Sequence, residues 1–295
     1  MQRKLIKHGP SSHIIVLPAK WVANNSLSAG DYLSLEEHPD HIIISLEGHT
    51  HKSVATVQVD GLDRTSIMLT IRAAYRQGYH TIHVQHNNIH AEHLRVQEQV
   101  SIPSVIHTEV NRLIGVEIVD QQAHKTTIQE LSKPSSEELR GVHRKLFTMT
   151  HQLILHLADQ DSEQIDIEQR HDVITRTASF VIRTARGGAQ LTSLEREQFL
   201  HAASSIDIIV DIIKYHKRTL QPTPISYAKT LAQAMAEVEN VVFGHKLSAM
   251  RAFQECKADL RKQPVERLDT VIDILSDIIV THATPKNMNK VNTYI

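Results

Sequence analysis

The chain has 295 residues, of which 41% are hydrophobic and only 4% aromatic, and its formal net charge is −1. This length allows two or three domains with cores of their own, and the aliphatic composition favours helices over β-sandwiches. The near-neutral charge excludes a protein that binds polyanions over its whole surface, so a nucleic-acid site would need local segregation of charge.

The chain has a single cysteine, Cys256, which excludes an internal disulfide and is typical of a reducing compartment. We expect no signal peptide, because charged residues precede any apolar run. We also expect no membrane insertion, because the most apolar stretch, IDIIVDII, contains two aspartates. The sequence therefore predicts a soluble, cytoplasmic protein.

The first fifty residues alternate short apolar runs with turn residues. Residues 3–9 and 13–17 are predicted strands joined by Gly-Pro-Ser-Ser, and a short helix is expected after Pro18. Residues 32–37 and 41–46 are predicted to pair through a turn at Pro39-Asp40. Four short strands cannot bury much core alone, so we expect this domain, residues 1–50, to interlock with a second copy.

Charge is sorted along this domain. Residues 1–26 carry four basic side chains and no acidic ones, whereas residues 27–48 carry five acidic side chains and no basic ones. A basic edge opposite an acidic edge would orient the domain on the phosphates of a nucleic acid. The alternative explanation is accidental clustering of charges in a small domain.

The order RKLIKHGPSSHIIVLPAKW followed by LSAGDYLSLEE resembles the swapped-hairpin AbrB/MazE DNA-binding domain over residues 2–47. The similarity covers a strand, a glycine turn, a strand that ends in Leu-Pro, a short helix and a closing hairpin. It implies an intertwined homodimer whose basic strands and turn lie on a palindromic or repeated DNA site. His8 and His13 would add to the DNA contacts if they were protonated; the alternative is that both are neutral surface histidines. The residues that the resemblance assigns to DNA contact are Arg3, Lys4, Lys7, Ser11, Ser12 and Lys20.

Residues 53–132 alternate between strand-like and helix-like patterns and predict a small α/β connector. The expected helices cover residues 63–78 and 103–115, and the expected strands cover residues 54–59, 80–85, 116–120 and 125–131.

The connector also contains a run of histidines at positions 80, 83, 86, 90 and 93. A metal site would need these imidazoles to converge. His83 would instead share a solvent face opposite Ile82 and Val84. The chain has 21 histidines, so we attribute the run to composition.

Residues 136–282 are predicted to be helical, after a boundary at residues 133–136 and before a loose tail at 284–295. Breaks near residues 160–162, 187–188, 222–224, 244 and 264 divide this region into six helices. The segments IDIIVDII (206–213) and IDILSDII (272–279) are identical at six of eight positions, 66 residues apart. Each would be the third helix of a group, so we expect tandem three-helix bundles at 136–221 and 224–283.

Each repeat places two aspartates on one helix face, Asp207 with Asp211 and Asp273 with Asp277. The rest of each segment is apolar almost all round, as in a buried helix, so the paired carboxylates need water or a positive partner. Three interpretations stay open. The first is that the aspartates face water, with Lys214 one helical turn after Asp211. The second is that they pair with basic residues of a neighbouring helix, such as Arg176 or Arg183. The third is that they bind a cation.

The tandem bundles resemble the phosphate-signalling PhoU family, and residues 55–131 are similar to the connector of its archaeal members that carry an AbrB-like head. The resemblance implies a divalent or trivalent metal bound by acidic-x-x-x-Asp motifs on adjacent helices.

The sequence departs from this pattern in the first bundle, where Val173 and Thr175 replace an acidic pair. In both bundles aspartate stands where the family commonly has glutamate, and Ile208 and Ile274 replace an arginine. We therefore expect any metal at the second bundle. The candidate ligands are Glu255, Asp259, Asp273 and Asp277, with Asp207 and Asp211 as the pair in the first bundle.

Together these features predict a homodimeric DNA-binding regulator of phosphate uptake whose PhoU-like bundles sense phosphate status through a partner or ligand. The alternative is an adaptor that docks on a phosphate transporter or signalling protein and uses the first domain mainly for dimerisation. A MazE-type antitoxin fits less well, because most of this chain is expected to be folded helix. An enzyme is not expected, since the sequence has no glycine-rich phosphate loop before a helix, no G-x-S-x-G and no H-E-x-x-H.

Overall fold

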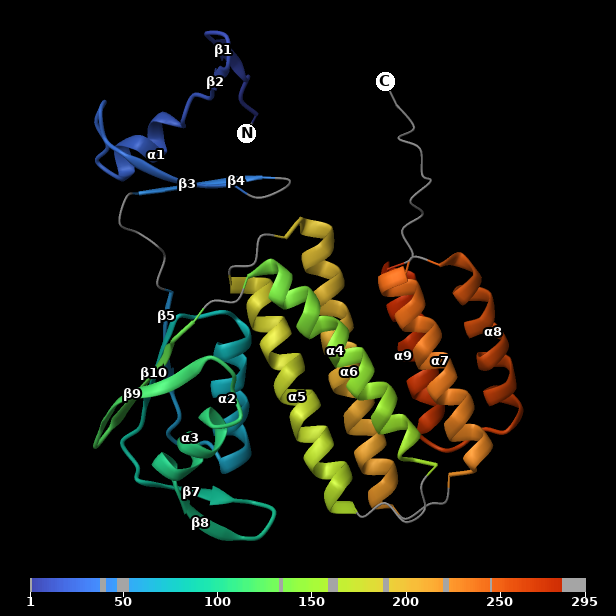
Figure 1. Ribbon diagram of the computed structural model, residues 1–295. Helices are drawn as coiled ribbons and strands as arrows, with labels where there is room; N and C mark the ends of the chain where they lie inside the picture. The colour runs from blue at the N-terminus through green and yellow to red at the C-terminus, as the bar shows by residue number, and fades with distance from the viewer. Residues whose placement is uncertain are drawn as a thin grey trace. The chain divides into compact units, whose positions relative to one another are not determined.

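The structure is a computed structural model with a mixed α+β fold of helices and small sheets (Figure 1). The chain divides into two compact units. One, here called the head, comprises residues 1–37 and 41–51, and the other comprises residues 38–40 and 52–295. Among the described helices, none is long and apolar enough to cross a membrane. The structure describes residues 2–37, 41–46, 53–132, 135–158, 164–187, 191–219, 223–244 and 246–282.

The head contains the elements that the sequence predicts. Strands β1 (Ile6–His8) and β2 (Ser12–Ile14) form an antiparallel hairpin, and α1 (Ala19–Asn24) begins directly after Pro18. Gly9, in the turn of this hairpin, has a φ of 76°, a conformation that glycine adopts without strain. Strands β3 (Leu33–Glu37) and β4 (Ile42–Leu46) form a second hairpin, whose predicted turn at 39–40 lies outside the described residues.

The head has no core of its own among its described residues. The two hairpins are separate two-stranded sheets, and none of the side chains that the structure describes in residues 2–37 and 41–46 is buried. An isolated two-stranded hairpin is at best marginally stable in water. The large aliphatic side chains exposed here are Leu5, Ile6, Ile14, Ile15, Val16, Leu35, Ile42 and Ile43.

The connector is built on a four-stranded sheet with the strand order β5-β6-β10-β9, in which only the β5–β6 pair is parallel. Its helix α2 begins after Asp63, whose carboxylate accepts hydrogen bonds from the amides of Thr65 and Ser66. A hairpin of β7 and β8, which the sequence pattern does not predict, lies between β6 and α3. The connector elements are β5 (Val54–Gln58), α2 (Arg64–Arg76), β6 (Thr81–Gln85), β7 (His90–His93), β8 (Glu98–Ser101), α3 (Ile102–Val110), β9 (Val116–Gln122) and β10 (Lys125–Glu130).

The predicted six helices of the helical region are confirmed within the described residues. Helices α4 and α6 each begin with a capping box, formed by Ser135 with Glu138 and by Thr192 with Glu195. The predicted boundary at 133–134, the break at 160–162 and the tail at 284–295 lie outside the described residues. The six helices are α4 (Ser136–Leu155), α5 (Gln164–Gly187), α6 (Ser193–Arg218), α7 (Ile225–Gly244), α8 (Leu247–Lys262) and α9 (Leu268–His282).

The two groups of three helices share a single hydrophobic core that draws buried residues from all six helices. Within it α4 packs on α7 and α6 packs on α9, so the equivalent first and third helices of the repeat meet (Figure 1). The repeated segments of α6 and α9 bury most of their isoleucines in this core; Asp211, Asp273 and Asp277 are exposed, and Asp207 is half-buried. Ile208, beside the aspartates of α6, is exposed, so the apolar character of that segment extends beyond its buried face.

The connector is attached to the helical region along α2 and α5. The guanidinium of Arg183 in α5 is buried and donates to the carbonyls of Tyr75 and Tyr79 and to Glu130 of β10. Arg76, at the end of α2, donates to the hydroxyl of Ser179. These contacts, together with the approach of Gly78 to Gly187, are called the α2–α5 joint below.

Candidate functional site

The basic residues of the head lie on its surface. Arg3 and Lys4 precede β1, Lys7 lies in β1 opposite His13, and Lys20 lies in the first turn of α1; all four are exposed. Ser11 is exposed in the turn of the hairpin. The hydroxyl of Ser12 donates to the carbonyl of His8, so this predicted DNA contact also closes the turn. The six predicted residues therefore belong to β1, the segment before it, β2, their turn and α1.

The first aspartate pair of the repeat is held by ion pairs. Asp207 accepts from Arg76 at 2.6 Å, and Arg76 comes from the connector rather than from a neighbouring helix of the bundle. The ion-pair interpretation is therefore confirmed for Asp207, but its predicted partners are wrong. Arg183 is engaged in the α2–α5 joint, and Arg176 is exposed on α5.

Asp211 belongs to a second polar group on α5 and α6. Its Oδ1 lies 2.8 Å from Nε2 of His171 and 3.6 Å from the ammonium of Lys214. The pKa of Asp211 is lowered, mainly because of the hydrogen bond from His171, while partial burial acts in the opposite direction.

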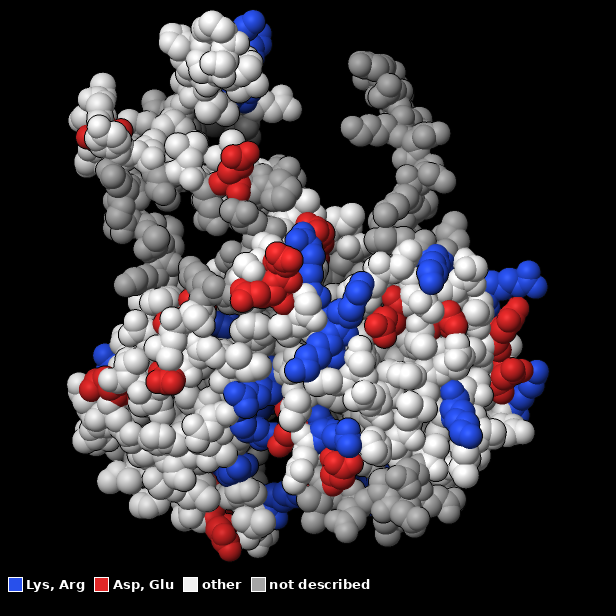
Figure 2. Space-filling view, viewed as in Figure 1, with Lys and Arg blue, Asp and Glu red and all other residues white. Residues whose placement is uncertain are grey.

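On the face shown in Figure 2, basic and acidic side chains lie next to one another down the middle of the second unit. The helical surface there carries paired charges rather than a patch of one sign.

The predicted metal ligands Glu255, Asp259 and Asp273 of the second bundle each lie beside a basic side chain. Asp273 is 2.6 Å from Arg261, Glu255 is 3.2 Å from Arg251, and Asp259 is 2.7 Å from Lys262. Asp277 is exposed on α9. Over the part of the chain that the structure describes, no group of three or more His, Cys, Asp or Glu side chains is placed to hold a metal ion. A metal at the second bundle stays a prediction.

The histidines of the connector have separate local contacts. His83 lies on β6 between the buried Ile82 and Val84, and its Nδ1 is 3.2 Å from the hydroxyl of Thr127. His86 is buried, with its Nδ1 2.7 Å from the carbonyl of Asn88. The predicted solvent face of β6 is therefore half-buried, and on it His83 contacts Thr127 of the neighbouring strand β10.

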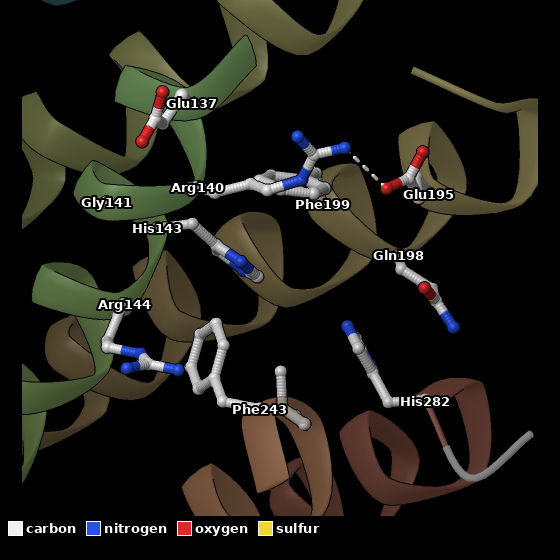
Figure 3. Close-up of a pocket in the computed structure, with 11 residues that line it drawn as sticks. Glu137, Arg140, Gly141, His143, Arg144, Glu195, Gln198, Phe199, Phe243 and His282 are labelled. Carbon is white, nitrogen blue, oxygen red and sulfur yellow. Dashed lines mark hydrogen bonds and ion pairs between the residues drawn. The ribbon is translucent and has the colours of Figure 1, made fainter. Parts of the chain in front are cut away.

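A cavity of about 520 Å³ opens between the two halves of the helical region. Rings from four helices surround its inner end: His143 of α4, Phe199 of α6, Phe243 of α7 and His282 of α9 (Figure 3). His143 lies 4.4 Å from Phe199 and 5.4 Å from Phe243, measured between ring centroids. The charged residues that line the cavity are Glu137, Arg140, Arg144 and Glu195.

His143 stays uncharged in this setting. Burial lowers its pKa to about 3, and the nearby His282 adds to this effect. A neutral imidazole offers one donor and one acceptor. The described residues provide no hydrogen-bond partner for its Nε2, which is buried. The cavity therefore has a neutral, aromatic inner end that carries a free hydrogen-bonding atom.

Arg76, His171 and the cavity were not predicted from the sequence. Arg76 and His171 meet their partners across separations of 131 and 40 residues, so local patterns gave no signal for them. His143 did give a signal. It occupies the same apolar stripe of α4 as Leu139, Leu146 and Phe147, where a polar residue is unusual.

Comparison of the chain with protein-family models, with curated proteins and with solved structures finds no match.

Proposed function

We propose that the protein is a cytoplasmic, homodimeric transcription regulator that binds DNA through its head and regulates phosphate uptake. The observation that carries this proposal is the exposed basic surface of β1, its turn and α1, which contains Arg3, Lys4, Lys7 and Lys20 and no acidic residue before Asp31. Such a surface suits phosphate contacts that are independent of base sequence.

The absence of a core from the described part of the head supports the dimer. Its exposed aliphatic side chains would be covered if the hairpins of two copies interlocked, as the resemblance to the AbrB/MazE domain implies. Two paired heads would present two basic surfaces to half-sites about one helical turn apart.

The link to phosphate rests on the resemblance of the six-helix region to the PhoU family. In this proposal the helical region binds a partner or ligand and shifts the geometry of the paired heads, which changes their fit to the two half-sites. A phosphate transporter or signalling protein is the partner that this resemblance favours.

The proposal is tested by fluorescence anisotropy of the full-length protein with DNA from its own promoter at several salt concentrations. The double variant Lys4→Gln/Lys7→Gln should weaken binding and flatten the dependence of log K on log salt by about 0.9 for each phosphate that is no longer neutralised. The control is Lys145→Gln/Lys229→Gln, which removes two exposed lysines from the helical region instead. Absence of DNA binding by the unaltered protein would contradict the proposal and favour the docking adaptor.

A further inference from the structure

The cavity between α4, α6, α7 and α9 combines a flat, apolar inner end with a charged rim. The rings of Phe199 and Phe243 flank His143, and their centroids lie 4.4 and 5.4 Å from the centroid of the imidazole. The cavity volume, about 520 Å³, is within the range of sites that enclose a small organic molecule. Planar, apolar surface of this kind favours a ligand that contains a ring.

The hydrogen-bonding atom at the inner end lacks a partner. The His143 residue is only 2% exposed, and its buried Nε2 has no hydrogen-bond partner among the described residues. An unsatisfied buried polar atom is costly and uncommon in folded proteins. A hydroxyl or amine on a ligand ring would satisfy it, since the neutral imidazole can donate or accept according to its tautomer.

The rim provides one arginine for an anion. Arg140 is already paired with Glu195 at 2.7 Å. Arg144, one turn further along α4, lies over the Phe243 ring at 4.9 Å and forms no ion pair with the part of the chain that the structure describes. The carboxylates of Glu137 and Glu195 lie on the same rim and would repel a multiply charged anion. The rim therefore suits a monoanion better than inorganic phosphate.

We propose that this cavity binds a small planar organic monoanion, an aromatic carboxylate with a polar substituent on its ring. The ring stacks on Phe199 and Phe243, the carboxylate pairs with Arg144, and the substituent reaches Nε2 of His143 when the side chains that cover this atom shift on binding. Binding here does not depend on whether the head binds DNA, so the two proposals can fail separately.

The test is isothermal titration calorimetry of the full-length protein with 6-hydroxy-2-naphthoate and with 2-naphthoate. We expect saturable binding at one site per chain, about tenfold tighter for the hydroxylated compound, because its hydroxyl pairs with His143. His143→Phe keeps a ring in the buried position and should make the two compounds bind equally. A failure to bind, or a preference that persists in His143→Phe, would overturn the proposal.

Two further variants locate the site. Arg144→Gln should weaken both compounds at least about tenfold, whereas Arg251→Gln, which removes an exposed arginine of α8 with the same change in net charge, should have no effect. Gly141→Leu should block binding without unfolding the protein, because a Cβ there meets no atom within 4 Å and leucine favours the helix. Equal weakening in Arg251→Gln, or binding of inorganic phosphate as tight as that of 2-naphthoate, would contradict the assignment.

Discussion

Gly78 and Gly187 meet backbone to backbone where the connector joins the helical region. A Cβ on Gly78 would lie 3.1 Å from the Cα of Gly187, and a Cβ on Gly187 would lie 3.4 Å from the Cα of Gly78. Gly78 also has a φ of 88°, which disfavours any other residue. Both glycines mark the ends of helices in the sequence, but only the structure shows that the two ends touch and bring Arg76 and Arg183 to their partners.

Substitution of Gly78 should therefore loosen the α2–α5 joint. We expect Gly78→Ala to lower the free energy of unfolding by about 2 kcal/mol, because the methyl group is strained by φ and crowded by Gly187. Urea denaturation followed by circular dichroism measures this change. The same substitution at Gly141, inside α4 with open space around it, should raise the free energy of unfolding by up to about 1 kcal/mol. Equal effects at the two sites would contradict the close contact.

The ion pair between Arg76 and Asp207 should stabilise the same joint. Both side chains are largely shielded from water, at 23% and 18% exposure. A double-mutant cycle with Arg76→Gln and Asp207→Asn should give a coupling free energy of about 2 kcal/mol. The cycle for Arg140 and Glu195, whose side chains are more exposed, should give less than about 1 kcal/mol. A coupling no larger for Arg76 than for Arg140 would show that the joint depends on packing alone.

The buried His143 should make stability depend on pH. Its pKa is lowered from 6.5 to about 3 in the folded protein, so between these values the unfolded chain binds a proton that the folded protein does not. The free energy of unfolding should therefore fall as the pH falls below 6.5, by up to about 1.4 kcal/mol per pH unit from this residue.

Urea denaturation between pH 7 and pH 4 tests this dependence. His143→Phe should make the free energy of unfolding depend less steeply on pH. Some dependence should persist, because burial also lowers the pKa of His216. The control is His107→Phe, at an exposed position of α3, which should leave the slope as it is. An unchanged slope in His143→Phe would mean that the ring is protonated or exposed in the folded state.

The exposed aliphatic side chains of the head should mediate its dimer. We expect Leu35→Lys to shift the full-length protein from dimer to monomer in sedimentation velocity, because the charge would be buried between interlocked copies. Val280→Lys is the matched control. Val280 in α9 is more exposed than Leu35, at 77% against 66%, and should tolerate lysine without a change in mass. A monomeric unaltered protein would contradict the interlocked head.

The single tryptophan should report on the proposed DNA surface. Trp21 lies in α1, next to Lys20 of the proposed DNA surface, and no other tryptophan exists in the chain. Addition of promoter DNA should change its emission, and Lys4→Gln/Lys7→Gln should reduce this change at the same DNA concentration. An emission that promoter DNA leaves unaltered would contradict the proposed DNA surface.

The sequence by itself determined the elements and their order. Short apolar runs between turn residues marked the head strands, and Pro18 and Asp63 marked where α1 and α2 begin, because turn and cap residues act on their immediate neighbours. The repeat at 206–213 and 272–279 correctly indicated two equivalent helices. The β7–β8 hairpin was missed, because its short strands, HAEH and EQVS, are too polar to show a pattern.

Only the tertiary structure decided which residues meet. The pairing of Asp207 with Arg76 joins positions 131 residues apart, and the cavity draws its lining from four helices. Local propensity carries no information about such contacts, because they arise when several helices pack on a common core and their side chains interlock. The repeat in the sequence predicted outward-facing aspartates that could hold a metal, but only packing decided that a basic side chain lies against Asp207, Asp211 and Asp273 and that Nε2 of His143 has no hydrogen-bond partner among the described residues.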